Sequence, residues 1–253
     1  MAMKAMVFAA GIGSRLKPYT DFHPKALVPV GGMPALQRTL LKLKDACVNE
    51  VVVNVHHFGC QIREFLHDND NFGLDVRISD ETELLLDTGG GLLKAASLLE
   101  DGTNEPILLH NADIITDFPI SDMQVEHERT GTDVSLLVAN RESSRQLYFS
   151  QDMGLKGWCN LTTGKKCPEN CCLNRLLPMA FGGVHIISPT LFPVLRKYAN
   201  DVVGTHAPFS IIPFYLWSMG KLSIKGHVPP MAYRWFDVGT PEKLALADKA
   251  FCV

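Results

Sequence analysis

A short glycine-rich segment near the start of the chain constrains its fold most. The apolar run at residues 3–9 predicts a buried strand, and Gly11 and Gly13 follow it directly. Arg15 comes two residues after the second glycine, and Lys25 follows a proline ten residues further on. Because glycine has no Cβ, backbone N–H groups can approach phosphate oxygens there, and the two cations can hold a polyphosphate. The sequence therefore predicts a phosphate-binding loop at the end of a strand.

Two better-known phosphate loops do not match this segment. The dinucleotide fingerprint G-x-G-x-x-G requires a third glycine where this chain has Leu16. The P-loop string G-x-x-x-x-G-K-[ST] does not occur in the chain. A dinucleotide-dependent dehydrogenase is therefore disfavoured.

The segment that is present reads G-x-G-x-R-L-x-P-x-T over residues 11–20 and P-K-x-L-x-P-V over residues 24–30. This pair of strings resembles the signature of the sugar-1-phosphate nucleotidyltransferases, the enzymes that make nucleotide-diphosphate sugars. The resemblance implies that Arg15 stabilises the leaving pyrophosphate and that Lys25 bridges the α-phosphate and the incoming phosphate. It also places Ala10, Gly11 and Gly13 against the nucleotide. The alternative is an ordinary strand-to-helix turn with surface charges.

The first half of the chain alternates between strand and helix patterns. Such an order predicts an α/β fold with a mostly parallel sheet flanked by helices on both faces. The resemblance implies the same Rossmann-like, nucleotide-diphospho-sugar transferase fold. Ligands of such sheets bind beyond the carboxyl ends of the strands. The expected strands are residues 3–9, 50–55, 74–79 and 106–111, and the expected helices are residues 35–46, 61–66 and 90–99.

The second half has a looser pattern. No linker interrupts the chain, so we expect a single domain over residues 1–253, with a nucleotide-binding half at 1–120 and a sugar-binding half at 121–253. Thr240 is the expected N-cap of the last helix, with a proline in its first turn. The remaining expected elements are strands at 133–139 and 183–187, a hairpin within 146–164, and helices at 191–199, 211–219 and 241–250.

Two aspartates are the candidate metal ligands. Nucleotidyl transfer needs a divalent cation to neutralise the triphosphate, and Mg²⁺ binds through one or two carboxylates. Asp113 follows the apolar run at residues 107–109, where packing does not explain a carboxylate. Asp237 lies in W-x-D-V-G-T-P-E-x-L, which resembles the closing motif of the family and implies a second metal ligand. At Asp113 the family string N-G-D has Ala112 in place of its glycine. For the motif that contains Asp237, the alternative is that it serves only as a helix N-cap.

The nucleotide base and the sugar are assigned to two further segments. The resemblance implies that Thr88, Gly89 and Gly90 lie near the base and ribose, and a helix N-cap by Thr88 is the alternative. It also implies that the backbone of Gly183 faces the sugar. The E-K-P string that many members carry is absent, and Trp158 stands in that region, where it either stacks on a sugar or packs a hairpin.

Bulk properties narrow the possible partners. A formal net charge of −3 gives no electrostatic reason to expect nucleic acid or an acidic membrane as a partner. The sequence contains no run of about eighteen apolar residues, so no transmembrane helix is predicted. The odd number of cysteines, 7, favours reduced thiols and a cytoplasmic location. The spacing of Cys159, Cys167, Cys171 and Cys172 is irregular, so we expect this cluster to be dispensable and to bind no zinc.

Together these observations predict a Mg²⁺-dependent transfer of a nucleoside monophosphate from a nucleoside triphosphate to a sugar 1-phosphate. The resemblance is to N-acetylmuramate-1-phosphate uridylyltransferases and mannose-1-phosphate guanylyltransferase-like members, with thymidylyl transfer to glucose 1-phosphate ranked behind them. The alternative is a catalytically inactive regulatory subunit that binds nucleotide sugars. The sequence leaves the base, the sugar and the oligomeric state open.

Overall fold

Four strands from the first half of the chain form the parallel core of the main sheet. The computed structural model describes residues 3–170, 172–204 and 207–252. Within it the strands lie in the order β5, β4, β1, β6, and each neighbouring pair is parallel. The bounds are β1 Lys4–Phe8, β4 Glu50–Val55, β5 Asp75–Asp80 and β6 Ile107–Asn111. The predicted α/β fold with a parallel sheet is confirmed.

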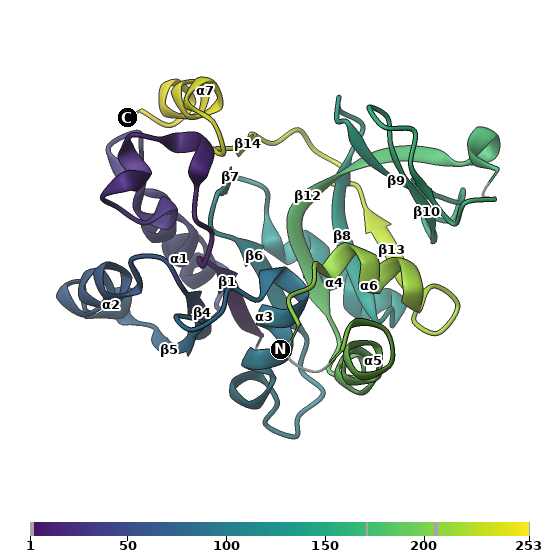
Figure 1. Ribbon diagram of the computed structural model, residues 1–253, viewed down its shortest axis with the longest axis horizontal. Helices are drawn as coiled ribbons and strands as arrows, with labels where there is room; N and C mark the ends of the chain where they lie inside the picture. The colour runs from purple at the N-terminus through teal and green to yellow at the C-terminus, as the bar shows by residue number, and fades with distance from the viewer. Residues whose placement is uncertain (1–2, 171, 205–206, 253) are drawn as a thin grey trace.

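An antiparallel strand from the second half extends this core. β12 (Leu177–Ile187) pairs with β6 on one side and with β8 (Val134–Ala139) on the other. Its first residues, Leu177 to Met179, pair with β9 instead. Figure 1 shows β12 leaving the centre of the molecule toward the β9–β10 hairpin at the upper right. The remaining strands of this part are β9 Arg145–Phe149, β10 Leu155–Asn160, β11 Lys166–Cys167 and β13 Ile224–His227.

The predicted hairpin at 146–164 is therefore confirmed as β9 and β10. β12 begins earlier than the expected strand at 183–187, because its first half belongs to the hairpin sheet and only its second half lies on the parallel core. A bulge between Phe181 and His185 marks the change. Gly183 lies in that bulge with φ +72°, a conformation that favours glycine.

Helices cover both faces of the sheet, and the strands show why. In β1, Met6 packs into one hydrophobic cluster while Ala5 and Val7 pack into the other, as the alternation of a strand buried on both faces requires. The first cluster contains residues of α3 (Asp87–Leu99), α5 (Leu191–Tyr198) and α6 (Ile211–Ser218). The second contains residues of α1 (Ala35–Asp45), α2 (Gly59–Asp68) and α4 (Ile120–Thr130).

Helix α4 was not expected from the sequence. Its first turn contributes Ile120 and Met123 to the core, but Val125 is 63% exposed, so the hydrophobic pattern is weak. Gly131, with φ +57°, ends it as a left-handed C-cap. The described residues contain no helix that is both long and apolar enough to cross a membrane.

A two-stranded ribbon joins the end of the chain to the sheet. β14 (Trp235–Asp237) pairs antiparallel with β7 (Ile114–Thr116), and α7 (Pro241–Phe251) follows it. Thr240 caps α7 as predicted, since its side chain accepts a hydrogen bond from the Lys243 N–H. A third hydrophobic cluster places α7 against the ribbon and against the loop that carries β2 (Pro29–Val30) and β3 (Met33–Pro34).

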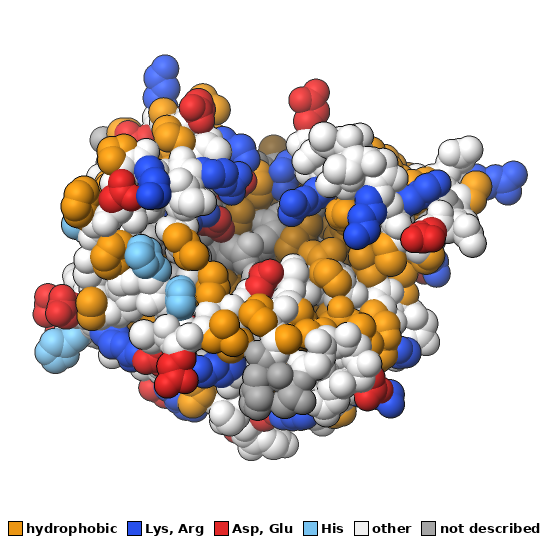
Figure 2. Space-filling view, in the orientation of Figure 1, with side chains coloured by type: hydrophobic (Ala, Val, Ile, Leu, Met, Phe, Trp, Pro, Cys, Tyr) orange, Lys and Arg blue, Asp and Glu red, His pale blue; other side chains and the backbone are white. Residues whose placement is uncertain are grey.

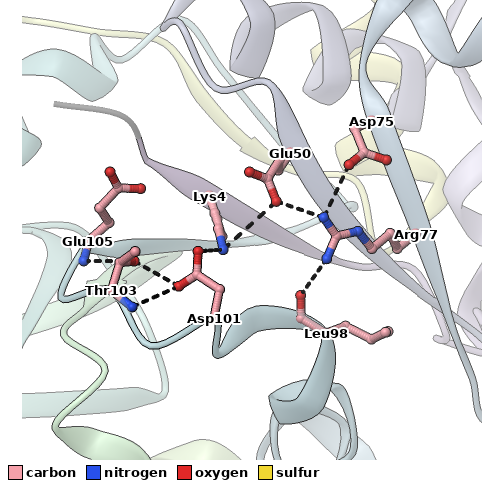
Figure 3. A network of polar contacts seen from close by, with 8 residues as sticks. All are labelled: Lys4, Glu50, Asp75, Arg77, Leu98, Asp101, Thr103 and Glu105. Atoms are coloured by element: carbon pink, nitrogen blue, oxygen red, sulfur yellow. Dashed lines mark hydrogen bonds and ion pairs between the residues drawn. The ribbon is translucent and has the colours of Figure 1, made fainter.

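The amino ends of the parallel strands are tied together by charge. Lys4, only 6% exposed, contacts the carboxylate of Asp101, and its Nζ lies 3.8 Å from Glu50. Arg77 on β5 donates to Glu50 and to Asp75, at 2.8 and 3.2 Å. Figure 3 shows this network at the amino ends of β1, β4 and β5. The opposite, carboxyl ends of the same strands are therefore the ones available for a site.

We predict that the folded state loses stability as pH falls below about 6.5. Burial lowers the pKa of His110 to about 4, and burial together with the nearby His110 lowers the pKa of His185 to about 3. Because the unfolded chain then binds more protons, stability is full above the ordinary histidine pKa and declines as pH drops toward 4. Urea unfolding at pH 7 to 4.5 should show this decline. In His110→Gln the slope of the unfolding free energy against pH should be shallower by up to about one proton. An unchanged slope would show that His110 does not cause the decline.

Candidate active site

A cavity of about 390 Å³ lies at the carboxyl ends of the parallel strands. Residues that end or follow β1, β4, β5 and β6 line it, as expected for a sheet of this kind. Figure 2 shows this face of the molecule hollowed in the middle, with Lys and Arg side chains along the upper edge of the hollow. The lining includes Ala9, Ala10, Gly11, Lys25, Asn54, Glu81, Asp87, Thr88, Asn111 and Asp113.

The two glycines of the first loop have different physical roles. Gly13 has φ +70°, and a Cβ there would lie 2.8 Å from the Thr20 methyl and 2.9 Å from the Lys25 Cβ. Its carbonyl accepts hydrogen bonds from the Leu16 N–H and the Thr20 hydroxyl, both at 2.8 Å. A Cβ at Gly11, in contrast, would meet no atom within 4 Å. Gly13 thus shapes the loop, and Gly11 leaves open space beside the cavity.

Lys25 and Asp113 meet at the edge of the cavity. Lys25 lies in a short 3-10 helix (Lys25–Leu27) after Pro24, and its ammonium forms an ion pair with the Asp113 carboxylate. The two side chains are 13% and 26% exposed. A partly buried charge pair of this kind is strengthened by reduced solvent screening. The phosphate loop and the first predicted metal ligand are therefore in direct contact.

Three cations favour the ionised form of Asp237. Lys243, on the first turn of α7, donates to its Oδ2 at 2.7 Å. Burial raises the pKa of Asp237, but the hydrogen bond and charge of Lys243, with the charges of Lys25 and Arg15, outweigh burial and leave the pKa below its usual value. The carboxylate is therefore ionised at neutral pH. Arg15 is exposed, and its guanidinium lies close to Gly239, where a Cβ would be 2.9 Å from the Arg15 Nη2 and 2.7 Å from the Asp237 Oδ1.

The ribbon of β7 and β14 brings the two aspartates together across 124 positions of sequence. Asp237 pairs with Ile114 in the ribbon, and the Val238 N–H donates to the Asp113 carbonyl at 2.9 Å. The Oδ1 of Asp237 is buried and has no hydrogen-bond partner among the described residues. A buried carboxylate oxygen without a partner suits a cation, because isolated buried polar atoms are costly. The donor set of two carboxylates fits Mg²⁺, which prefers oxygen ligands.

The segment predicted to lie near the base and ribose makes hydrogen bonds within the protein. Thr88 lines the cavity, and its hydroxyl accepts a hydrogen bond from the Ile211 N–H at 3.0 Å. The N–H groups of Gly89 and Gly90 both donate to the Phe209 carbonyl, at 2.9 and 3.1 Å. A Cβ at Gly89 would lie 2.4 Å from the Phe209 ring. These two glycines therefore allow close packing against residue 209, and Thr88 does not act as the N-cap considered from the sequence.

Sequence reasoning missed two polar residues in the cavity wall. Asn54, on β4, accepts from the Ala9 N–H at 2.7 Å and donates to Glu81 at 2.7 Å. Glu81 is fully buried and also accepts from the Leu86 N–H at 3.0 Å. Together they fix the phosphate loop to the segment that precedes α3. The signal was present, because Asn54 interrupts the apolar run at 50–55 just as Asp113 follows the run at 107–109.

The two predicted sugar-side residues lie in different places. A Cβ at Gly183 would lie 2.7 Å from Ile114 and 3.1 Å from the Asn111 amide, so its backbone is close to the end of β6. Trp158 packs against the hydrophobic core and lines a second cavity of about 720 Å³ between the hairpin and α6. Phe181 and Trp217 also line that cavity, which shares no lining residue with the first. The role of Trp158 toward a sugar stays a prediction.

The cysteines near the hairpin are separated by the strand pairing. Cys159 is buried on β10 and pairs with Lys166, while Cys167 on β11 pairs with Trp158. Cys172 is exposed, and Cys171 lies outside the described residues. The expectation that the cluster is dispensable stays a prediction.

Comparison with known proteins supports the family. A family profile described as nucleotidyl transferase matches residues 4–149. An N-acetylmuramate alpha-1-phosphate uridylyltransferase of Caulobacter vibrioides is 33% identical over 252 residues, covering 96% of this chain and 95% of that protein. The chain belongs to the nucleotidyl transferase family. The resemblance to sugar-1-phosphate nucleotidyltransferases that its motifs indicate is confirmed.

Two further matches extend this result. A probable mannose-1-phosphate guanylyltransferase of Oryza sativa subsp. japonica is 34% identical over 137 residues, which cover 54% of this chain and 38% of that protein. A solved structure of a UDP-glucose pyrophosphorylase complexed with UDP-glucose has a TM-score of 0.77 at 16% identity, covering 99% of this chain and 98% of that chain. The structural match shows the fold.

We predict that Gly11→Ala weakens nucleotide binding without destabilising the fold. The added methyl meets no protein atom within 4 Å, so folding is not strained, but it occupies the space beside the cavity that a phosphate would approach. The Kd for a nucleoside triphosphate, measured by calorimetry, should rise about tenfold or more while the melting temperature stays within about 2 °C, since a surface change without contacts is nearly neutral. Unchanged affinity would show that phosphates do not approach Gly11.

Proposed function

We propose that the chain transfers a uridylyl or guanylyl group from a nucleoside triphosphate to a sugar 1-phosphate, with Mg²⁺ bound by Asp113 and Asp237. The observation that carries this is that Lys25 and Asp113 form an ion pair in the cavity wall, and that Lys25 and Arg15 both act electrostatically on Asp237. N-acetylmuramate 1-phosphate is the first candidate acceptor, because the relative of that activity matches along nearly its whole length. Mannose 1-phosphate with GTP is the second, on the shorter match.

The residues present are suited to in-line displacement at phosphorus. An oxygen of the sugar phosphate attacks the α-phosphorus of the triphosphate, the bond to the β-phosphate oxygen breaks, and pyrophosphate leaves. The attacking phosphate is already anionic at neutral pH, so no general base is required. Catalysis then consists of positioning and charge stabilisation. When bound, Mg²⁺ would neutralise triphosphate charge between the two carboxylates.

Each cation has a distinct place in this proposal. In this proposal Lys25, which is partly buried beside Asp113, contacts the α-phosphate and the incoming phosphate. Arg15, exposed beside Gly239, offers a planar fork to the leaving pyrophosphate. Lys243 holds Asp237 in position through the 2.7 Å hydrogen bond. The cavity wall of Ala9 to Gly11, Asn54 and Thr88 would receive the nucleoside.

The alternative of an inactive regulatory subunit uses the same cavity without turnover. Retention of Arg15, Lys25, Asp113 and Asp237 in mutual proximity disfavours it, because binding alone does not require this set. A cytoplasmic location stays a prediction from the sequence.

The test is a grid of nucleoside triphosphates against sugar 1-phosphates with Mg²⁺, read as pyrophosphate release. We expect UTP or GTP with one acceptor to exceed all other pairs, with one nucleotide sugar formed per pyrophosphate, and chelation of the metal to abolish release. Lys25→Ala should lower turnover by about 10²-fold or more, as loss of a charge-stabilising group does. Binding of nucleotide without release in any pair would favour the regulatory subunit.

A further inference from the structure

Arg141 is a half-buried cation fixed in a rigid position. It follows β8, and its guanidinium carbon lies 3.6 Å from the centroid of the Trp235 ring. Its Nη2 donates to the Phe181 carbonyl at 2.5 Å. Trp235 is itself held, since its indole N–H donates to the Gly182 carbonyl at 2.8 Å. Stacking and hydrogen bonding therefore orient the guanidinium and leave most of its five N–H donors without a partner among the described residues.

No carboxylate of the described residues forms an ion pair with Arg141, whereas the partly buried Lys25 has one. Burial lowers the pKa of Arg141, while Tyr233 and Asp237 act in the opposite direction. A cation taken partly out of water is costly unless it is paired. Its free donors are thus arranged for an anion that is not part of the described protein.

The position of Arg141 indicates which anion this is. Trp235 and Asp237 are two residues apart on β14 and so lie on the same face of the strand, which places Arg141 beside Asp237. Arg141 comes from the second half of the chain, on the side of β8 and β12. It does not line the cavity at the carboxyl ends of the parallel strands, where the nucleotide is proposed to bind. Lys25 and Arg15, which act electrostatically on Asp237 together with Lys243, are already assigned to the substrate phosphates in the proposed function. Arg141 is therefore available for a different anionic group.

We propose that Arg141 determines acceptor specificity by binding a carboxylate substituent of the sugar 1-phosphate. This inference rests on the proposed function and adds the class of acceptor, an acidic sugar. N-acetylmuramate carries such a carboxylate on its lactyl ether, whereas N-acetylglucosamine lacks it. A guanidinium matches a carboxylate with two parallel N–H···O bonds, which a lysine does not reproduce.

The experiment compares N-acetylmuramate 1-phosphate with its lactyl carboxamide, a neutral analogue of the same shape. We expect the wild-type chain to prefer the acid by about 10²-fold in kcat/KM, because a hydrogen bond to a charged group is stronger than one to its neutral analogue. In Arg141→Gln this preference should fall to within about threefold, through loss on the acid alone. Arg141→Lys, which retains the cation over Trp235, should be intermediate. The control Arg175→Gln removes an exposed charge from the 3-10 helix before β12 and should keep the preference.

The outcomes separate this proposal from the proposed function. Equal losses on acid and amide would show that Arg141 serves the phosphate or the fold, and a wild-type chain without preference for the acid would also overturn the proposal. Calorimetric binding of the two sugar phosphates to wild type and Arg141→Gln, with nucleotide present, gives the same comparison without turnover. If no pair of substrates reacts but the acid still binds through Arg141, the proposed function fails and the carboxylate site stands.

Discussion

The site depends on holding two carboxylates, Asp113 and Asp237, next to each other. Like charges in a partly buried place repel, so their proximity needs compensation. Lys25 pairs with the first and Lys243 with the second, and the hydrogen bond from the Val238 N–H to the Asp113 carbonyl fixes the spacing of the two segments. The remaining buried oxygen of Asp237 has no partner among the described residues. The protein thus compensates the charge of both carboxylates with its own lysines, and the proposed cation would become the partner of the remaining oxygen.

The two ends of the parallel strands have different roles in this arrangement: the amino ends stabilise the sheet, and the carboxyl ends carry the site. At the amino ends of the parallel strands, the network around Lys4 and Arg77 ties the strands to one another. At the carboxyl ends, the turns carry the site instead, and buried Asn54 and Glu81 link the phosphate loop to the start of α3. The β7–β14 ribbon then brings the last segment of the chain onto this edge, with α7 packed in its own hydrophobic cluster.

Local patterns of sequence predicted the first half of the fold well, because its strands are buried on both faces and its helices are amphipathic. The motifs also predicted that Lys25, Asp113 and Asp237 share one site. What they did not predict depends on long-range pairing. Helix α4 carries exposed Val125, β12 divides between two sheets, and Lys243 and Arg141 acquire their roles only through neighbours far away in sequence. The amides of Gly89 and Gly90, two residues that the motifs placed near the base and ribose, donate to the Phe209 carbonyl, another long-range contact.

The most direct test of this account is a double-mutant cycle of Asp113→Asn and Asp237→Asn, with turnover measured at saturating Mg²⁺ and the affinity for a nucleoside triphosphate measured with and without the metal. If both carboxylates hold one cation, each single variant should lose about 10²-fold or more in turnover, and the double variant should lose little beyond either single one, because groups that act as a unit are not additive. The advantage that Mg²⁺ gives to nucleotide binding should vanish in all three variants. Fully multiplicative losses, or a metal advantage that survives in either single variant, would contradict a shared metal site.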